Sequence, residues 1–479
     1  MTVQKRYPVS LLFAFVIFFF LITLPLSSGC TEDLKEPAVA GIFYPSDQGE
    51  LKKTVQAFLS KAKRVKADGK LIAMISPHAG YIYSGQVAAY GYKQIKGSDI
   101  RKVILIGPSH HANFRGASVY AKGRFKTPLG VLKIDEETAQ KLLNDSADVK
   151  FFPLAFEKEH SLEVQLPFLQ SVLDNFTIVP ILVGSPTKET LEHLSEVLSD
   201  LLDEKTLLVA STDLSHYHEY SKAKDMDAKI VASIERLSLS ETERLLRSGD
   251  AELCGAFPVL ITMEAARRCG ANLGILFKYA NSGDVTEEKS KVVGYASIGF
   301  FRTSLLEEEK RELLSIARNA IHGFVTKGKN VEIDMKNLKL NTDGAAFVTI
   351  KKNGSLRGCI GHVHPVMPLY QSVIKNAVSA CSSDPRFPPV KPDELKDIDI
   401  EISLLSPLRK LNDVKEIQIG RHGLVIRKGL RQGILLPQVA KENGWDRDTF
   451  LEQLCAKAGL QREAWRDAEL YLFTAEIIK

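Results

Sequence analysis

Three short, almost uninterrupted apolar runs constrain the fold most strongly, because each leads into a residue that can bind a transition metal. The runs cover residues 71–76, 103–107 and 206–210, and they lead into His78, into His110, and into Asp213 and His216. Runs of this length are typical of strands that are buried on both faces of a parallel sheet. Open α/β sheets bind ligands beyond the carboxyl ends of their strands, so we expect these four side chains to converge at one sheet edge.

The length of the chain and the pattern of its predicted helices and strands indicate two domains. At 479 residues the chain exceeds the usual size of one domain. Strand-like runs alternate with helical stretches at residues 50–63, 135–144, 188–202 and 222–237, which predicts α/β layers over residues 30–303.

A second domain is expected to begin at Ser304. Ser304 and Glu307 have the spacing of a capping box that starts a helix, and Gly323 is expected to end that helix. Beyond this point a turn at residues 352–354 and an alternating strand at 397–404 predict a smaller α+β domain over residues 304–479.

Composition excludes several classes of protein. With 44% hydrophobic and 25% charged residues, the chain has the composition of a globular protein rather than a disordered one. The net charge is +5, but acidic residues are interleaved with Lys and Arg, so no basic stripe for nucleic acid is present in the sequence. None of the six cysteines forms a C-x-x-C pair, which excludes a zinc ribbon.

The N-terminus has the pattern of an export segment. Lys5 and Arg6 precede an apolar run at residues 9–26, and Ser28 and Gly29 precede Cys30. A positive region followed by an apolar region is typical of a signal peptide, and small residues before a cysteine resemble a bacterial lipoprotein site. We therefore expect residues 1–29 to be a signal peptide, with a lipid on Cys30, or an uncleaved membrane anchor. Either form predicts an exported, membrane-attached protein of the bacterial cell envelope.

The residue types at the predicted sheet edge favour a metal site. His78 and His110 each follow a strand directly, and imidazole nitrogens bind Fe, Cu, Ni and Zn. A third ligand is needed, and three candidates remain open on the residues alone: Cys254, Asp213 and Glu159. A thiolate ligand would favour Fe or Cu over Mg or Ca.

Further polar residues near these strands are candidates for acid–base chemistry. Glu159 and His160 lie in a dense cluster of acids and histidine, and such groups often hold the outer nitrogen of a metal-binding histidine. His216 is a candidate general base, with Asp213 placed to orient it.

Residues 36–301, which contain these motifs, resemble the Memo family. The resemblance rests on five segments, which are residues 77–81, 107–111, 159–163, 211–216 and Cys254-Gly255. It implies a fold similar to class III, LigB-like non-haem iron dioxygenases and a metal site of His78, His110 and Cys254. It also implies that Asp213, His216 and His160 surround the same cleft. Gln165 stands where animal members carry a histidine, so the role of that histidine does not transfer.

Residues 305–479 resemble the AMMECR family. The resemblance rests on residues 356–361, 384–387 and 433–438. The two families are the A and B proteins of the AmmeMemoRadiSam system, so the resemblance implies a radical SAM protein as a partner. Arg357 and Cys359 have two interpretations, an anion-binding Arg beside a thiol or a closely packed turn around Gly358, and the second is favoured.

These observations lead to three functional hypotheses. The first is a redox protein that uses Fe(2+), or else copper, to act on a small organic or aromatic substrate; a cysteine in place of the usual carboxylate argues against ordinary extradiol ring cleavage. The second is a metal-binding or peptide-binding scaffold without catalysis. The third is a zinc-dependent hydrolase.

Overall fold

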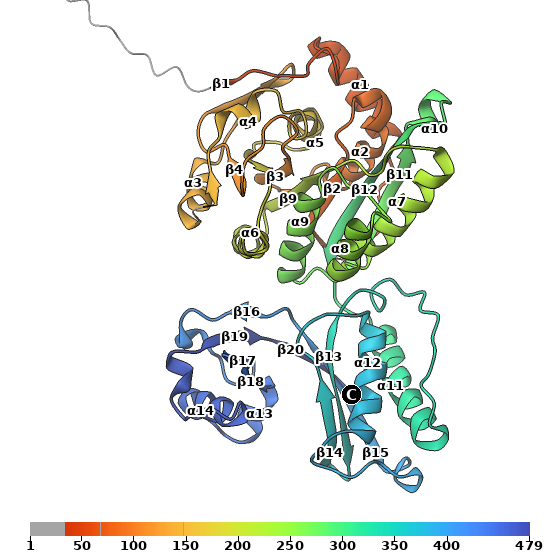
Figure 1. Ribbon diagram of the computed structural model, residues 1–479, viewed down its shortest axis with the longest axis vertical. Helices are drawn as coiled ribbons and strands as arrows, with labels where there is room; N and C mark the ends of the chain where they lie inside the picture. Colours follow the sequence, from red (N-terminus) through yellow and green to blue (C-terminus); the bar gives the residue numbers. More distant parts are fainter. Residues whose placement is uncertain (1–33, 68, 147) are drawn as a thin grey trace, which may run out of the picture.

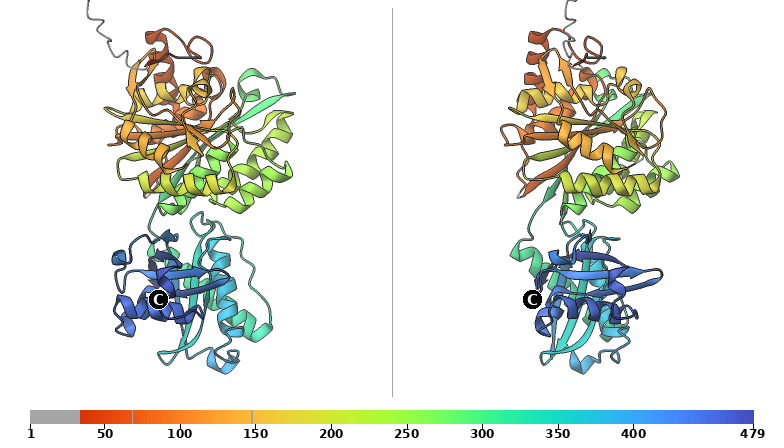
Figure 2. Two further views of the ribbon diagram at one scale, coloured as in Figure 1. Left: turned by 60° about the vertical axis from the view of Figure 1, so that its left-hand side comes forward. Right: turned by 90° about the vertical axis from the view of Figure 1, so that its left-hand side faces the viewer.

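The computed structural model describes residues 34–67, 69–146 and 148–479. The segment at residues 1–29 and Cys30 lie outside the described residues. Within the described part of the chain, none of the helices combines the length and apolar character needed to cross a bilayer. The described residues form two bodies that lie one above the other along the long axis of the molecule (Figures 1 and 2).

The first body is built on a large mixed sheet. Among the described residues it has nine strands, in the order β10-β12-β2-β9-β3-β8-β4-β7, with β11 paired to β12. Their bounds are β2 (Lys70–Ser76), β3 (Lys102–Pro108), β4 (Ala117–Val119), β7 (Val149–Lys150), β8 (Thr177–Val183), β9 (Thr206–Ser211), β10 (His216–His218), β11 (Leu273–Asn281) and β12 (Val292–Arg302). A small second sheet contains β1 (Leu34–Lys35), β5 (Arg124–Thr127) and β6 (Gly130–Lys133).

The centre of the large sheet is parallel, as the three apolar runs predict. Strands β2, β9, β3 and β8 pair in parallel in that order. Every residue of β9 is buried, and Ile104, Leu105 and Ile106 of β3 have no exposed surface. Such strands contribute most to the stability of the fold when both faces of the sheet are covered, because the hydrophobic stabilisation is roughly proportional to the apolar area removed from water.

Helices cover both faces of this sheet (Figure 1). α1, α2 and α5 pack together on one face, and α6, α8 and α9 pack on the other, where α9 contacts β2, β3 and β9. The helices are α1 (Gln48–Lys61), α2 (Tyr81–Ile95), α3 (Glu136–Asp145), α4 (Pro153–Glu157), α5 (Leu166–Val172), α6 (Lys188–Leu201), α7 (Tyr220–Glu235), α8 (Leu239–Ser248), α9 (Ala256–Arg268) and α10 (Gly283–Thr286), with a 3-10 turn, η1, at Glu163–Gln165. The result is the α/β layering that the alternation of the sequence predicts.

The second body contains two four-stranded antiparallel sheets rather than one continuous core. One sheet has the order β14-β13-β15-β20 and packs with α11 and α12, and the other has the order β16-β19-β17-β18 and packs with α14. Their elements are α11 (Glu307–Lys327), β13 (Ala345–Lys352), β14 (Ser355–Gly361), α12 (Leu369–Ser382), β15 (Ile398–Leu405), β16 (Arg409–Lys410), β17 (Gly423–Lys428), β18 (Arg431–Leu435), α13 (Pro437–Glu442), α14 (Arg447–Lys457), β19 (Glu469–Phe473) and β20 (Ala475–Ile478). Each sheet has its own hydrophobic cluster.

Two local predictions for this body are confirmed, and two that concern its first helix are wrong. Asn353 and Gly354 form the turn between β13 and β14 with positive φ, as a tight hairpin requires, and β15 lies where the alternating strand was expected. The predicted capping box at Ser304 is wrong. α11 begins two residues later, where the Glu309 carboxylate accepts a hydrogen bond from the Leu306 N–H at 2.7 Å. Gly323 does not end the helix, which continues to Gly328, where φ is +65°.

The two bodies are joined at the sheet edge opposite the predicted metal ligands. β12 leaves the large sheet where Phe301 and Arg302 pair with Leu71 and Lys70, at the amino end of β2. His78 follows the carboxyl end of the same strand. The second body is therefore attached far from the edge that gathers the candidate ligands.

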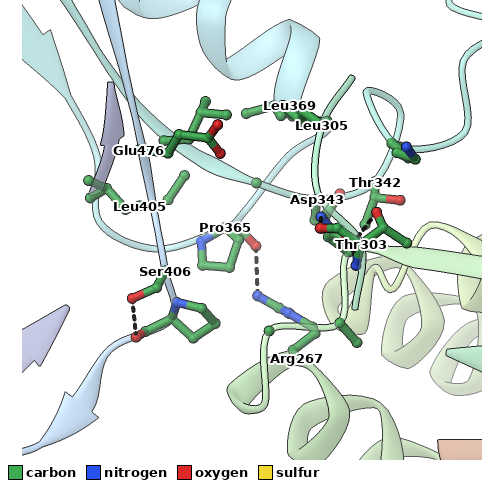
Figure 3. A pocket seen from close by; sticks show the side chains of 18 of the residues that line it. Arg267, Thr303, Leu305, Thr342, Asp343, Pro365, Leu369, Leu405, Ser406 and Glu476 are labelled. Atoms are coloured by element: carbon green, nitrogen blue, oxygen red, sulfur yellow. Dashed lines mark hydrogen bonds between the residues drawn. The ribbon is translucent and has the colours of Figure 1, made fainter. Parts of the chain in front are cut away.

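A cavity of about 280 Å³ lies between the two bodies (Figure 3). Arg267 of α9 donates a hydrogen bond to the Pro365 carbonyl at 3.2 Å, and the Asp343 N–H donates to the Arg236 carbonyl at 3.1 Å. Burial raises the pKa of the Asp343 carboxyl, although Ser238, Arg267 and Arg236 oppose the shift. One oxygen of this carboxyl is buried without a hydrogen-bond partner among the described residues.

Candidate metal centre

The three neighbouring strands β2, β9 and β3 bring the candidate residues to one edge. His78 follows β2, Asp213 follows β9 and His110 follows β3, all at carboxyl ends. Cys254 comes from the loop before α9, and its N–H donates to the Asp213 carbonyl at 3.3 Å. Parallel pairing thus gathers residues that are far apart in the chain.

His78, His110 and Cys254 form one cluster. One ligand atom from each lies within 4.8 Å of the others. The Cys254 Sγ lies 3.1 Å from His78 Nε2, and the imidazoles of His78 and His110 meet edge to face with centroids 5.1 Å apart. The donor set of two imidazoles and one thiol fits a transition metal such as iron, copper or zinc.

The two rival third ligands are directed elsewhere. The Asp213 carboxylate accepts a hydrogen bond from the His78 N–H at 2.8 Å. The Glu159 carboxylate accepts from both the backbone N–H of His110, at 2.6 Å, and its ring Nδ1, at 2.8 Å. Glu159 therefore lies behind His110 and leaves its Nε2 for the cluster, which is the usual arrangement around a metal-binding histidine.

Burial sets the protonation states in the cluster. Burial, and then the charge of His110, lowers the pKa of His78 to about 3, so its ring is neutral near pH 7. Burial, reinforced by Asp213, raises the pKa of the Cys254 thiol to about 12. Burial opposes ionisation of Glu159, but its hydrogen bonds from His110 outweigh this and lower the pKa to about 2. A bound cation would favour the thiolate form of Cys254, since metal binding displaces protons from such ligands.

His160 and His216 lie beside the cluster. The His160 ring stacks on His110 with centroids 4.5 Å apart, and the Phe43 ring meets it edge to face at 4.8 Å. Ring atoms of His110 and His160 with a Glu159 oxygen form a second set of ligand atoms within 4.8 Å of one another. His216 Nδ1 contacts the Leu214 carbonyl at 2.8 Å.

Two polar residues of this region, Glu252 and Ser211, were not singled out from the sequence, and Gln165 was noted only as a departure from the family pattern. Glu252 contacts His218 Nε2 at 2.9 Å and accepts from the His216 N–H at 3.2 Å. Ser211 contacts His78 Nδ1 at 2.9 Å, and Gln165 donates to Ser211. Glu252 lies only two positions before Cys254, which is a usable signal; Ser211 and Gln165 look like ordinary residues of a strand and a helix start.

In the second body, the residues of the Leu356–Gly361 segment have structural partners. Arg357 forms two hydrogen bonds to Glu394 and one each to the Pro388 and Pro389 carbonyls. A Cβ on Gly358 would lie 2.2 Å from the Ala380 carbonyl oxygen, so only glycine fits there. The close packing is confirmed, but the predicted turn is wrong, because Gly358 and Gly361 lie within β14 and neither has a positive φ.

Two histidines that follow Cys359 closely in the sequence contact other groups. His362 contacts Asn376 and Ser372, and His364 contacts Arg427. The Asp384 carboxylate instead accepts from the Cys359 N–H at 2.8 Å.

Comparison with known proteins gives one family match for each of the two bodies. Residues 35–299 match the family of Memo-like proteins, and residues 314–478 match the AMMECR1 family. Among curated relatives, a MEMO1 family protein of Methanobrevibacter smithii is 36% identical over 284 residues, which are 56% of this chain and 100% of that protein. A MEMO1 family protein of Aquifex aeolicus is 38% identical over 275 residues, 56% of this chain and 99% of that protein.

A solved structure is also similar. An uncharacterised protein of Pyrococcus horikoshii is 38% identical, covers 36% of this chain and 92% of its own, and has a TM-score of 0.35. The Memo-like match spans more than half of the chain and contains the cluster of His78, His110 and Cys254. The chain therefore belongs to the Memo family and carries an AMMECR1 domain after its Memo-like domain.

Proposed function

We propose that the Memo-like domain is a metal-dependent redox protein that acts on a small organic or aromatic substrate. His78, His110 and Cys254 would hold Fe(2+), or else copper, because their ligand atoms lie within 4.8 Å of one another at the carboxyl edge of the sheet. This convergence of three residues from distant parts of the chain is the observation that carries the proposal.

The surrounding residues have defined roles in it. A redox-active iron or copper ion supplies one-electron and dioxygen chemistry when bound. Glu159 and Ser211 hold the outer nitrogens of His110 and His78, so both rings keep their orientation. His216, with its Nδ1 at the Leu214 carbonyl, has Nε2 left to give a proton to substrate or take one from it.

A kinship with LigB-like, class III non-haem iron dioxygenases is part of this proposal. The parallel strand centre and the cluster at its carboxyl edge support such a fold. Those enzymes use a carboxylate where this chain has Cys254, so we propose oxidation of a small molecule rather than ordinary extradiol ring cleavage. A thiolate is a softer ligand and binds iron and copper well.

Partner and location are further proposals. The pairing of Memo-like and AMMECR1 domains in one chain supports a shared task with a radical SAM protein of the same system. Lys5, Arg6, the apolar run at 9–26 and Cys30 support export and attachment to the bacterial cell envelope.

Metal content tests the function directly. The protein lacking residues 1–30 is purified anaerobically, and bound metals are measured for the wild type and for His110→Ala. We expect iron or copper near one ion per chain in the wild type and loss of it in the variant. Zinc at that level would favour the hydrolase, and no metal in either protein would favour a scaffold; both results would overturn the redox proposal.

A further inference from the structure

A line of buried, hydrogen-bonded side chains lies behind His78 and includes Ser211. The Tyr92 hydroxyl donates to Gln165 Oε1 at 2.7 Å, Gln165 Nε2 donates to Ser211 Oγ at 2.9 Å, and Ser211 Oγ contacts His78 Nδ1 at 2.9 Å. Tyr92, Gln165 and Ser211 have no exposed surface, and His78 is 2% exposed. Buried polar atoms must satisfy one another, so the positions of the protons along this line can be deduced.

The amide of Gln165 has one orientation. Its nitrogen lies 2.9 Å from the Pro77 carbonyl oxygen, which can only accept. Rotating the amide by half a turn would bring two acceptor oxygens together at this point. Nε2 therefore donates one hydrogen to Pro77 and the other to Ser211, while Oε1 accepts from Tyr92.

The hydroxyl of Ser211 is then fully assigned. It has one hydrogen and two lone pairs. The hydrogen goes to the Ser161 carbonyl oxygen at 2.5 Å, because that oxygen cannot donate. One lone pair accepts from Gln165. Only a lone pair remains for His78, so the imidazole must be the donor, and its proton lies on Nδ1.

The opposite nitrogen of the ring follows from this. With the proton on Nδ1, the neutral imidazole carries its lone pair on Nε2, which is the nitrogen 3.1 Å from the Cys254 sulfur. We propose that Ser211, oriented by Gln165 and Ser161, is a positioning residue that fixes His78 in this tautomer, ready to bind metal before any metal arrives. The importance of this for metal binding rests on the proposed function, whereas the tautomer itself does not.

The tautomer can be measured on the metal-free protein. In protein with 15N-labelled histidine, long-range 1H–15N spectra report which ring nitrogen carries the proton, and His78→Gln identifies the His78 signals. We expect His78 to be protonated on Nδ1 in the wild type. In Ser211→Ala the acceptor is absent, so we expect a mixture of tautomers or protonation on Nε2. The affinity for Zn(2+), used as a probe, should fall about 10- to 100-fold, as for other residues that orient metal-binding histidines.

Ser118→Ala is the matched control. Ser118 is a fully buried serine of β4 whose Oγ accepts one backbone hydrogen bond, from Phe152 at 2.9 Å. The Ser118→Ala variant should leave both the His78 tautomer and the affinity for Zn(2+) unchanged. Ser211→Thr, which keeps the hydroxyl, should retain the Nδ1–H form if Ser211→Ala does not fold.

The outcomes separate this inference from the proposed function. Protonation of His78 on Nε2 in the wild type, or an unchanged tautomer in folded Ser211→Ala, would overturn the role of Ser211. A wild type that shows the Nδ1–H form but binds no iron, copper or zinc would overturn the proposed function and leave the assignment of the tautomer intact.

Discussion

The sulfur of Cys254 lies 3.1 Å from Nε2 of His78, although 176 positions separate the two residues. The loop before α9 holds the sulfur there, because the Asp213 N–H donates to Sγ at 3.1 Å and the Cys254 N–H donates to the Asp213 carbonyl at 3.3 Å. The sulfur and the imidazole are thus placed by the sheet and by α9 together.

Replacement of this cysteine should affect metal binding specifically. We expect Cys254→Ser to weaken binding of iron or copper by more than about 100-fold, since loss of a residue that only orients a ligand costs about 10- to 100-fold. Cys269→Ser is the control, since Cys269 lies at the other end of α9 and contacts the Ser199 carbonyl. Metal titrations of both variants measure the difference. Equal losses in the two variants would reduce Cys254 to a packing residue.

The edge of the sheet was predictable from the sequence because the apolar runs of β2, β3 and β9 are nearly continuous, and each ends in a ligand-type residue. The third member of the cluster was not predictable from pattern alone. Cys254 follows no strand, and a cysteine before a helix is more often a small buried hydrophobe. The roles of Ser211 and Gln165 could not be predicted either, because hydrogen bonds between distant buried residues leave no periodic signal.

Glu159 should be needed to orient His110. In Glu159→Gln, the amide cannot accept from both the backbone N–H and the ring of His110 as strongly as the carboxylate does. We expect metal affinity to fall about 10- to 100-fold, with the domain still folded. Glu157→Gln is the matched control, because Glu157 is exposed. Isothermal titration measures the metal affinity of both variants. Equal affinities would contradict the role assigned to Glu159.

The Memo-like domain should bind metal without its neighbour. β12 leaves the sheet beside the amino end of β2, whereas the candidate ligands His78, His110 and Cys254 lie at the carboxyl end. A fragment of residues 31–303 should therefore keep the full-length stoichiometry of metal. Limited proteolysis of the full chain should cut near Ser304. Loss of metal from a folded fragment would mean that the AMMECR1 domain supports the site.

The internal division of the AMMECR1 domain was not predictable. Its strands and hairpin turn have clear local patterns, but two separate four-stranded sheets arise from pairings such as β15 with β20 and β17 with β19. Such pairings depend on which distant strands meet, and alternation within one strand carries no information about its partner. The start of α11 was misplaced for a related reason. Glu309, rather than Glu307, reaches back to the chain before the helix.

Ionisation of Asp343 should make the stability of the folded chain depend on pH. Burial raises the pKa of this carboxyl, so the folded chain holds its proton to higher pH than the unfolded chain does. Ionised Asp343 therefore costs stability at neutral pH, and the cost disappears as the pH falls below the ordinary carboxyl range. Asp343→Asn should raise the thermal midpoint at pH 7 but not at pH 3.5.

The exposed Asp334 provides the comparison. Its ion pair with Lys336 is open to solvent and contributes little. Asp334→Asn should leave the midpoint nearly unchanged at either pH. A lower midpoint for Asp343→Asn at pH 7 would mean that the charge of Asp343 stabilises the contact with Arg236 and Arg267 more than burial penalises it.

Membrane attachment should depend on Cys30 if this residue carries lipid. Each buried methylene of a lipid chain contributes about 0.8 kcal/mol, so a single chain holds weakly and several anchor firmly. Cys30→Ala should leave a precursor that keeps its first 29 residues, which mass spectrometry of the N-terminus detects. Under the alternative of an uncleaved anchor, the same change should alter neither the mass of the processed chain nor its recovery with membranes.

A second variant separates the two forms of attachment from no attachment. Inserting charge into the apolar run, as in Phe18→Asp with Phe19→Asp, should prevent export in both cases, because charged residues are costly in the apolar core of a membrane. The variant should then accumulate in the cytoplasmic fraction while the wild type sediments with membranes. Recovery of the intact wild-type chain from the cytoplasmic fraction would contradict the lipoprotein and the anchor alike, since both require the first 30 residues to engage the membrane.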